Sequence, residues 1–439
     1  MTQAAQTRPS MKAAVVFTCI TSTRPKRLTK VFGLRNGALT KQSAANMTEG
    51  QADRHRVAGL QILANFLEAL KPNQAIAWGV TELAKVRVTT ADCVLDDSTA
   101  IARSREYFSF REQPGVLMLD HDGAPGDVLN CDELRDRLIE ACPALSSAPM
   151  LWRPSASSGI RMADGLLLTN TGKHRLYIPV ADASQIPAAG KRLLHLLWAA
   201  GHGWYEVGNA GQALERSLVD GSVWQPERLD FAARPILQDG LVRSSGEYKI
   251  YGEADALFDL SLIRLDDAAE KQATKNRKTA RTGVREQCAT KRGEWALECA
   301  SSLAKERKIS VEQAQSVLLR ASEHQVLMGD FILVAENGSR VSVGEVLDDP
   351  DRWHQAKFAD PLGDYPDDQR IATANLKSGT RPALRSFGHG GQTFELRRQS
   401  TRIQVGKGRR VEATDNTLAV SEARVLRALQ SDDRSANMS

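Results

Sequence analysis

The sequence predicts an α+β fold, with helices on one side of a β-sheet, built from more than one compact unit. Strand-like and helix-like segments follow one another without the strict alternation that a doubly wound parallel sheet requires. With 439 residues the chain exceeds the size of one ordinary core. Hydrophobic residues make up 42% and charged residues 25%, which is the usual range for a soluble globular protein.

Residues 1–100 are expected to form an N-terminal α/β module. Residues 13–20, AAVVFTCI, have the continuous apolar character of a buried strand. Asn36-Gly37 is the kind of dipeptide that supplies the two positive φ angles of a tight hairpin. Apolar residues then recur at helical spacing over 57–70, and the helix ends before Pro72 because proline disfavours helical geometry in the preceding residue.

The central residues 101–262 carry most of the chemically informative motifs. An apolar strand is expected at 116–119, and a helix is expected to begin at Asp132. The other expected elements are strands at 165–169, 175–180, 217–219 and 229–237 and a helix at 190–201.

Residues 263–330 change to a long, polar and basic helical region. Between Lys271 and Arg292 there are eight Lys or Arg residues against one Glu, a local excess of the kind that contacts a polyanion. The candidate residues for such contacts are Lys275, Arg277, Lys278, Arg281 and Arg285, and a solvated, charged helix is the alternative. Residues 331–430 are expected to form a C-terminal α/β accessory region, with strands at 331–336 and 339–344 and a hairpin around Gly390-Gly391.

The overall charge and the cysteines narrow the class of protein. A formal net charge of +5 mildly favours a polyanionic partner. The six cysteines form no CxxC pair, so reduced thiols are expected rather than a zinc ribbon or a redox motif. No cleavable leader and no apolar run of about eighteen residues occurs, which predicts a cytoplasmic protein without a membrane partner.

The sharpest local motif is VLMLDHDG, residues 116–123. Side chains alternate along a strand, so Asp120 and Asp122 are expected on one face and His121 on the other. Two carboxylates so close repel each other unless a cation lies between them. Mg²⁺ or Mn²⁺ suits this arrangement, because hard cations bind one or two carboxylates together with water and substrate phosphate. A solvated strand end is the alternative for Asp-x-Asp on its own.

Two further motifs suit the binding of phosphate groups. Residues 154–160, PSASSGI, form a small-residue loop in which Ser155, Ser157 and Ser158 can approach a triphosphate. The second motif precedes an apolar strand and joins a histidine to two cations; its residues are Lys173, His174 and Arg175. A basic strand entry that faces water is the alternative.

A third acidic position lies in SLVDGSVWQPERLDFAARP. Asp220 follows the apolar step Leu218-Val219, much as Asp120 follows its strand, whereas Asp230 lies inside the next expected strand. Either carboxylate could complete the set, and Arg228 supplies positive charge nearby.

In this order the motifs resemble those of the archaeo-eukaryotic primase superfamily, especially primase-polymerases of plasmids, phages and integrated mobile elements. That superfamily carries an hhhDhD motif, a Ser-x-His motif before an apolar strand and a hydrophobic-Asp motif. They match Asp120 and Asp122, then His174, then Asp220, within residues 100–260. Gly172 stands where the motif has Ser.

The resemblance implies an RRM-like palm core and a DNA primase or polymerase of a bacterial mobile element. It implies that Asp120, Asp122 and Asp220 hold Mg²⁺ or Mn²⁺ and that His174 contacts the phosphates of a nucleoside triphosphate. The implied partner is single-stranded DNA, with any helicase or replication initiator supplied by other chains, because no P-loop is present.

Two other functions fit the same residues. Paired and third aspartates also serve metal-dependent nucleases. Alternatively, the chain is a catalytically inactive DNA-binding replication initiator. A zinc site from Cys288, Cys299 and His324 has no recognised spacing.

Overall fold

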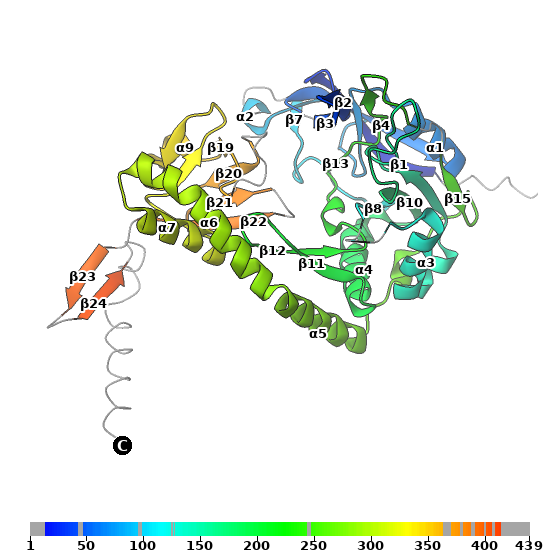
Figure 1. Ribbon diagram of the computed structural model, residues 1–439. Helices are drawn as coiled ribbons and strands as arrows, with labels where there is room; N and C mark the ends of the chain where they lie inside the picture. Colours follow the sequence, from blue (N-terminus) through cyan, green and yellow to red (C-terminus); the bar gives the residue numbers. More distant parts are fainter. Residues whose placement is uncertain are drawn as a thin grey trace, which may run out of the picture. The chain divides into compact units, whose positions relative to one another are not determined.

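The computed structural model describes residues 14–42, 47–94, 99–123, 126, 128–243, 247–362, 370–377, 381–387, 391–398, 401–405 and 409–413. The chain forms two compact units, one of residues 1–204 and 216–279 and the other of residues 205–215 and 280–439 (Figure 1). The predicted domain limits after residues 100 and 262 therefore fall inside the first unit. The limit after residue 330 falls inside the second.

The first unit contains a six-stranded sheet in the order β13-β5-β1-β4-β6-β7. Its neighbours are antiparallel except β6 and β7. The central strand β1, Ala14–Arg24, confirms the buried strand that the sequence predicts at 13–20. The other strands are β4 (Glu49–Ala58), β5 (Gln74–Ala77), β6 (Lys85–Thr89), β7 (Ala100–Ala102) and β13 (Leu229–Asp230). Because β13 joins this sheet from the middle of the chain, the first 100 residues are not a separate fold.

A small three-stranded sheet lies beside it, in the order β14-β2-β3. Strands β2 (Val31–Arg35) and β3 (Ala38–Gln42) form the predicted hairpin, and β14 is Ile236–Leu237. Asn36 and Gly37 have φ values of 52° and 77°, which confirms the left-handed turn expected there.

The second large sheet of this unit has four strands in the order β15-β9-β10-β8, all antiparallel, and is called here the β8–β10 sheet. Its strands are β15 (Lys249–Tyr251), β9 (Met150–Pro154), β10 (His174–Val180) and β8 (Gly115–His121). Its apolar side chains share one core with α1, α3 and α4 and with one face of β1. The predicted strands at 116–119 and 175–180 are thereby confirmed.

Helices of the first unit are α1 (Leu60–Glu68), α2 (Ala91–Val94), α3 (Cys131–Ala141), α4 (Ile186–Ala199) and α5 (Asp267–Gly283). The expected helix start at Val57 is wrong, because Val57 still pairs with Val15 in the sheet. Helix α3 is capped by Asn130, not by Asp132, since the Asn130 side chain accepts from the amides of Asp132 and Glu133. Helix α4 begins four residues before the predicted position of 190.

The expected strand at 165–169 is also wrong. Residues 161 and 167 form only an isolated bridge within a loop, because Asp164 and Gly165 turn the chain, with Gly165 at φ 95°. Strand β12 (Ala213–Ser217) lies just before the strand predicted at 217–219, and it pairs with β11 (Gly203–Val207). The expected strand at 229–237 is divided into β13 and β14.

The second unit joins long helices to a five-stranded sheet in the order β16-β22-β21-β20-β19. Its helices are α6 (Arg285–Arg307), α7 (Val311–His324), α8 (Val343–Asp348) and α9 (Pro350–Trp353). Its strands are β16 (Val326–Met328), β17 (Ile332–Val334), β18 (Arg340–Ser342), β19 (Lys357–Phe358), β20 (Ala372–Asn375), β21 (Ala383–Ser386), β22 (Gln392–Arg397), β23 (Thr401–Val405) and β24 (Arg409–Ala413). Strands β21 and β22 pair as the predicted hairpin, whose turn residue Gly390 lies outside the described residues.

The tip of the β11–β12 hairpin belongs to this second unit. Ala210 is fully buried among apolar residues of α6 and α7, and its carbonyl accepts a hydrogen bond from Ser322 Oγ. Among the described residues, none of the helices has both the length and the apolar character needed to cross a bilayer.

Candidate active site

Strand β8 presents its aspartate to a cationic neighbour. In the antiparallel register Asp120 lies opposite Arg175 of β10, and His121 lies opposite His174. Arg175 Nε donates to Asp120 Oδ1 at 3.4 Å. Asp122 follows the strand end with its side chain 66% exposed, and its Oδ1 lies 3.7 Å from Lys173 Nζ. Each of the two aspartates therefore has a cationic partner from the β10 side.

Arg175 is fixed from its other side by a buried carboxylate. Its Nη1 donates to Asp230 Oδ1, and Tyr177 OH donates to Asp230 Oδ2 at 3.1 Å. The Asp230 side chain has no exposed surface. Because both of its oxygens are engaged inside the protein, Asp230 acts as the anchor that aims Arg175 at Asp120.

Asp220 is joined to Asp120 by a hydrogen bond between their backbones. Its amide donates to the Asp120 carbonyl at 2.9 Å. Its carboxylate accepts from the amide and hydroxyl of Ser222, at 2.8 and 2.7 Å, and so caps a short 3₁₀ turn, Gly221–Val223. Of the two third-carboxylate candidates, Asp220 is the one that the fold leaves partly exposed.

The surroundings of Asp120 disfavour its negative charge. Burial, together with the charges of Asp122, Asp230 and Asp220, raises its pKa from 3.8 to about 6, although Arg175 acts in the opposite direction. Within the described part of the chain, no three His, Cys, Asp or Glu side chains converge closely enough to hold a metal ion. The donor set still fits a hard divalent cation, because such an ion relieves the repulsion that raises this pKa.

Strand β8 is held in place by Trp224, whose Nε1 donates to the Met118 carbonyl at 2.9 Å. The Trp224 ring in turn packs on Gly190 of α4, where a Cβ would come within 2.2 Å of it. The absence of a side chain at Gly190 thus allows the contact that positions the strand carrying Asp120.

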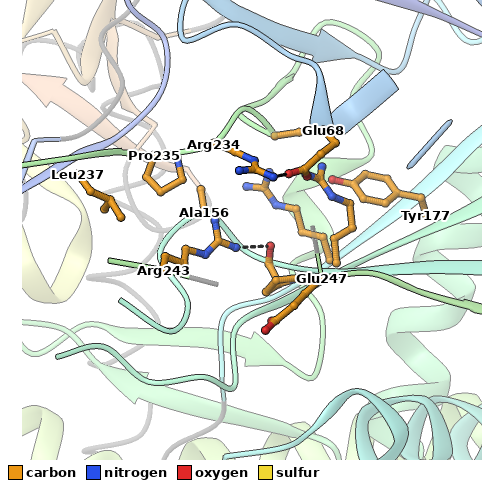
Figure 2. Close-up of a pocket in the computed structure, with 12 residues that line it drawn as sticks. Glu68, Ala156, Tyr177, Arg234, Pro235, Leu237, Arg243 and Glu247 are labelled. Atoms are coloured by element: carbon orange, nitrogen blue, oxygen red, sulfur yellow. Dashed lines mark hydrogen bonds and ion pairs between the residues drawn. The ribbon is translucent and has the colours of Figure 1, made fainter. Parts of the chain in front are cut away.

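A basic cavity adjoins the carboxylates through Arg175, and we call it the arginine cavity (Figure 2). Glu68, at the end of α1, forms ion pairs with two of its guanidinium groups, those of Arg153 and Arg234. The charged residues that line the arginine cavity are Arg153, Arg175, Arg234, Arg243, Glu68 and Glu247. Four positive charges against two negative ones make this cavity suited to an anion.

Lys30 also belongs to this region, although it lies ninety residues before Asp120. Burial and the nearby charges of Arg175 and Lys41 lower its pKa to about 8, whereas Asp122 and Asp120 raise it. No sequence motif marks Lys30, Arg153 or Arg243, because none of them lies in a distinctive local pattern. Only the fold brings them to this region.

The serine-rich loop lies beside the Lys173 segment. The Ser155 amide donates to the Lys173 carbonyl at 2.9 Å, and Ser158 Oγ donates to the Thr171 carbonyl at 2.9 Å. Ser155, Ser157 and Ser158 are all buried, and the loop residues that line the arginine cavity are Pro154 and Ala156. The fold therefore joins two motifs that the sequence separates by some fifteen residues.

His174 does not lie with the aspartates. Because neighbouring side chains on β10 alternate, it projects from the face opposite to Arg175. There its ring stacks on His121 at 5.9 Å between centroids. Arg228 is exposed and lies outside the lining of the arginine cavity. The geometry thus favours Arg175 over His174 as the β10 residue that acts beside Asp120.

The cations of the basic helical region differ in how exposed they are. On α5, Asn276 Nδ2 donates to the last carbonyls of α4, Trp198 O and Ala199 O, at 2.8 and 3.2 Å. Arg277 lies over the Trp198 ring at 5.1 Å and is half-buried. The exposed cations are Lys275, Lys278, Arg281 and Arg285.

The suggested zinc site of Cys288, Cys299 and His324 does not form in the described residues, where no such group of ligands converges. Cys288 is buried and Cys299 half-buried on α6.

Comparisons with known proteins add no assignment: no family model, no curated protein and no solved structure matches the chain significantly.

Proposed function

We propose that this chain is a metal-dependent nucleotidyltransferase, a DNA primase-polymerase whose palm-like core is the β8–β10 sheet. The observation that carries the proposal is the pairing of Asp120, whose pKa is raised to about 6, with an arginine-lined cavity through the shared residue Arg175. Phosphoryl transfer needs carboxylates for a hard cation and positive charge for the phosphates of the substrate.

Asp120 and Asp122 would hold Mg²⁺ or Mn²⁺, with Asp220 as the third carboxylate. Such an ion, when bound, neutralises charge on the α-phosphate and favours ionisation of the attacking 3′-hydroxyl. The guanidinium groups of the arginine cavity would orient the triphosphate, since planar forks match phosphate oxygens. Arg175 would then exchange part of its contact with Asp120 for a substrate phosphate while Asp230 holds it in place.

The template would be single-stranded DNA, bound by the exposed cations of α5 and the start of α6. The order of the acidic motifs supports membership of the archaeo-eukaryotic primase superfamily. A role in replicating a bacterial mobile element, in the cytoplasm and beside a separate helicase and initiator, follows from that resemblance.

The test is nucleotide incorporation on single-stranded DNA, with and without a primer, in Mg²⁺ or Mn²⁺. The Asp120→Asn, Asp122→Asn double variant should lose all product. The matched control is Asp136→Asn, which removes an exposed carboxylate on α3. Metal-dependent extension in the wild type and the control, but not in the double variant, supports a polymerase, and product without a primer supports a primase.

The same reactions separate the two competing functions. Shortening of the labelled DNA without incorporation, lost in the double variant, would assign a nuclease to the same carboxylates. DNA binding without turnover under any condition would overturn the enzyme proposal in favour of an inactive replication initiator.

A further inference from the structure

A second cavity lies where the opposite face of the β8–β10 sheet presents Trp152 and His174. We call it the tryptophan cavity. Trp152 lies across from Leu176 in the register, and Arg175 lies across from Arg153, so Trp152 and His174 share one face and the arginines the other. The proposed catalysis uses none of the residues on the Trp152 face.

His174 carries an unpaired hydrogen-bond acceptor within the wall of this cavity. Its Nε2 lies 2.6 Å from the Leu129 carbonyl, and a carbonyl can only accept, so Nε2 carries the hydrogen and Nδ1 the lone pair. Burial lowers the pKa of His174, which keeps the ring neutral and in this tautomer. His174 is only 3% exposed, and its Nδ1 is buried with no hydrogen-bond partner among the described residues.

Trp152 carries an unpaired hydrogen-bond donor in the same wall. Its ring centroid lies 5.4 Å from that of His174, and both rings line the cavity. In the part of the chain that the structure describes, the buried Trp152 Nε1 also has no acceptor. Buried polar atoms are nearly always paired in native proteins. An unpaired donor and an unpaired acceptor on two adjoining aromatic rings of the cavity wall therefore indicate a planar ligand with polar groups at its edge.

Two arginines supply positive charge to the same cavity. Arg161 is exposed, whereas Arg243 lines both cavities and donates through Nη2 to the Pro154 carbonyl at 3.2 Å. Burial, with the charges of Arg153, Arg234 and Arg175, lowers the pKa of Arg243 to about 10 although Glu247 acts in the opposite direction. An anion bound here would be attracted by Arg161 and would relieve the repulsion on Arg243.

We propose that the tryptophan cavity is a second nucleotide site, with the base against Trp152 and His174 and the phosphate at Arg161 and Arg243. The nucleotide is either a free molecule or the end of a single strand, since the recognising groups are the same. This site goes beyond the proposed function, because it lies on the other face of the sheet from Asp120. Arg243 connects the two cavities, so an occupant of one acts on the charge of the other.

The test is calorimetric titration of the full chain, in EDTA, with each of AMP, GMP, CMP and UMP and, separately, with a pentadeoxynucleotide. Monophosphates have no pyrophosphate to release, so their binding does not depend on catalysis. Trp152→Leu should weaken the binding of at least one probe about 5- to 150-fold, the range expected for loss of a base–aromatic stack. Arg161→Gln, at an exposed position, should weaken the same probe without affecting folding. Arg234→Gln changes the lining of the arginine cavity and reports any binding there. Arg228→Gln, at an exposed position outside the lining of both cavities, is the matched control and should bind normally.

Each result decides one point. Mononucleotide binding that depends on Trp152 and Arg161 assigns a free-nucleotide site, and the same dependence for the pentanucleotide alone assigns a strand end. Binding that is lost in Arg234→Gln but kept in Trp152→Leu and Arg161→Gln would place the nucleotide in the arginine cavity and overturn the proposal. So would the lack of saturable binding with every probe. A failed incorporation assay leaves these titrations unaffected, so the two proposals fail separately.

Discussion

Replacing Asp120 with Asn should make the metal-free protein more stable. Burial and three neighbouring carboxylates raise the pKa of Asp120 from 3.8 to about 6. The charged form is therefore disfavoured in the folded state relative to the unfolded chain. The contribution of Asp120 to the free energy of unfolding of the wild type is therefore fully present below about pH 4 and is lost as the pH rises through 6. Asn keeps the shape and the acceptor for Arg175 but never carries the charge.

The magnitude follows from the same values. The rise from 3.8 to about 6 corresponds to about 3 kcal/mol, at about 1.4 kcal/mol for each tenfold change in the ionisation constant. The assay is urea denaturation of both proteins in EDTA at pH 4 and pH 8. We expect Asp120→Asn to exceed the wild type by about 2–3 kcal/mol at pH 8 and by less than about 1 kcal/mol at pH 4. An equal difference at both pH values, or a less stable variant at pH 8, would refute the reasoning.

Divalent ions should reverse this order. If Asp120 and Asp122 hold Mn²⁺, an ion at about 100 times its Kd stabilises the wild type by about 2.7 kcal/mol and leaves Asp120→Asn nearly unchanged. The measurement is the same denaturation at pH 8 with increasing MnCl₂. Equal stabilisation of both proteins would mean that the ion binds elsewhere.

Three other predictions concern the surroundings of the site. Asp230→Asn should lower the free energy of unfolding by about 3–5 kcal/mol, because it removes the charged anchor of buried Arg175; a loss below about 1 kcal/mol in urea denaturation would contradict that role. Gly190→Ala should cost about 1–3 kcal/mol by overpacking Trp224, with a changed near-ultraviolet circular dichroism spectrum; an unchanged spectrum and stability would disprove the contact. Glutamine at the four exposed cations Lys275, Lys278, Arg281 and Arg285 should reduce the salt dependence of DNA binding. The slope of log K against log salt concentration should fall by about 0.7 for each phosphate contact that is lost. An unchanged slope would show that these residues do not contact DNA.

The acidic strand end could be predicted from the sequence because its signal is local. Four apolar residues before Asp120 determine a buried strand, and alternation then determines which side chains share a face. The same argument places His121 on the face of β8 opposite to the face that carries Asp120, as observed. For β10 the strand was predicted correctly, but Lys173, His174 and Arg175 were all expected to bind phosphate, because which face of a strand meets the aspartates depends on its register with a partner. A shift of one residue exchanges the two faces.

The arginine cavity could not be predicted, because its residues are distant in sequence and individually ordinary. Glu68 ends α1, Arg153 lies within β9, and Arg234 lies between β13 and β14. They meet only because two sheets of the first unit share a core. The domain limit expected after residue 100 differs from the structure for a similar reason. Strand β13 returns to pair with β5 by a long-range contact, and such contacts leave no local pattern in the chain.

The β11–β12 hairpin sets an order of events during synthesis. Ala210 leaves the ribosome long before Ser322, which covers it 112 residues later in the chain. At about 5–20 residues per second, the tip waits roughly 5–20 s for the helices that bury it. The first unit can therefore assemble most of its core while this one segment stays uncovered. A chain that stops at residue 279 would lack α6 and α7, so the tip that carries Ala210 would stay uncovered permanently.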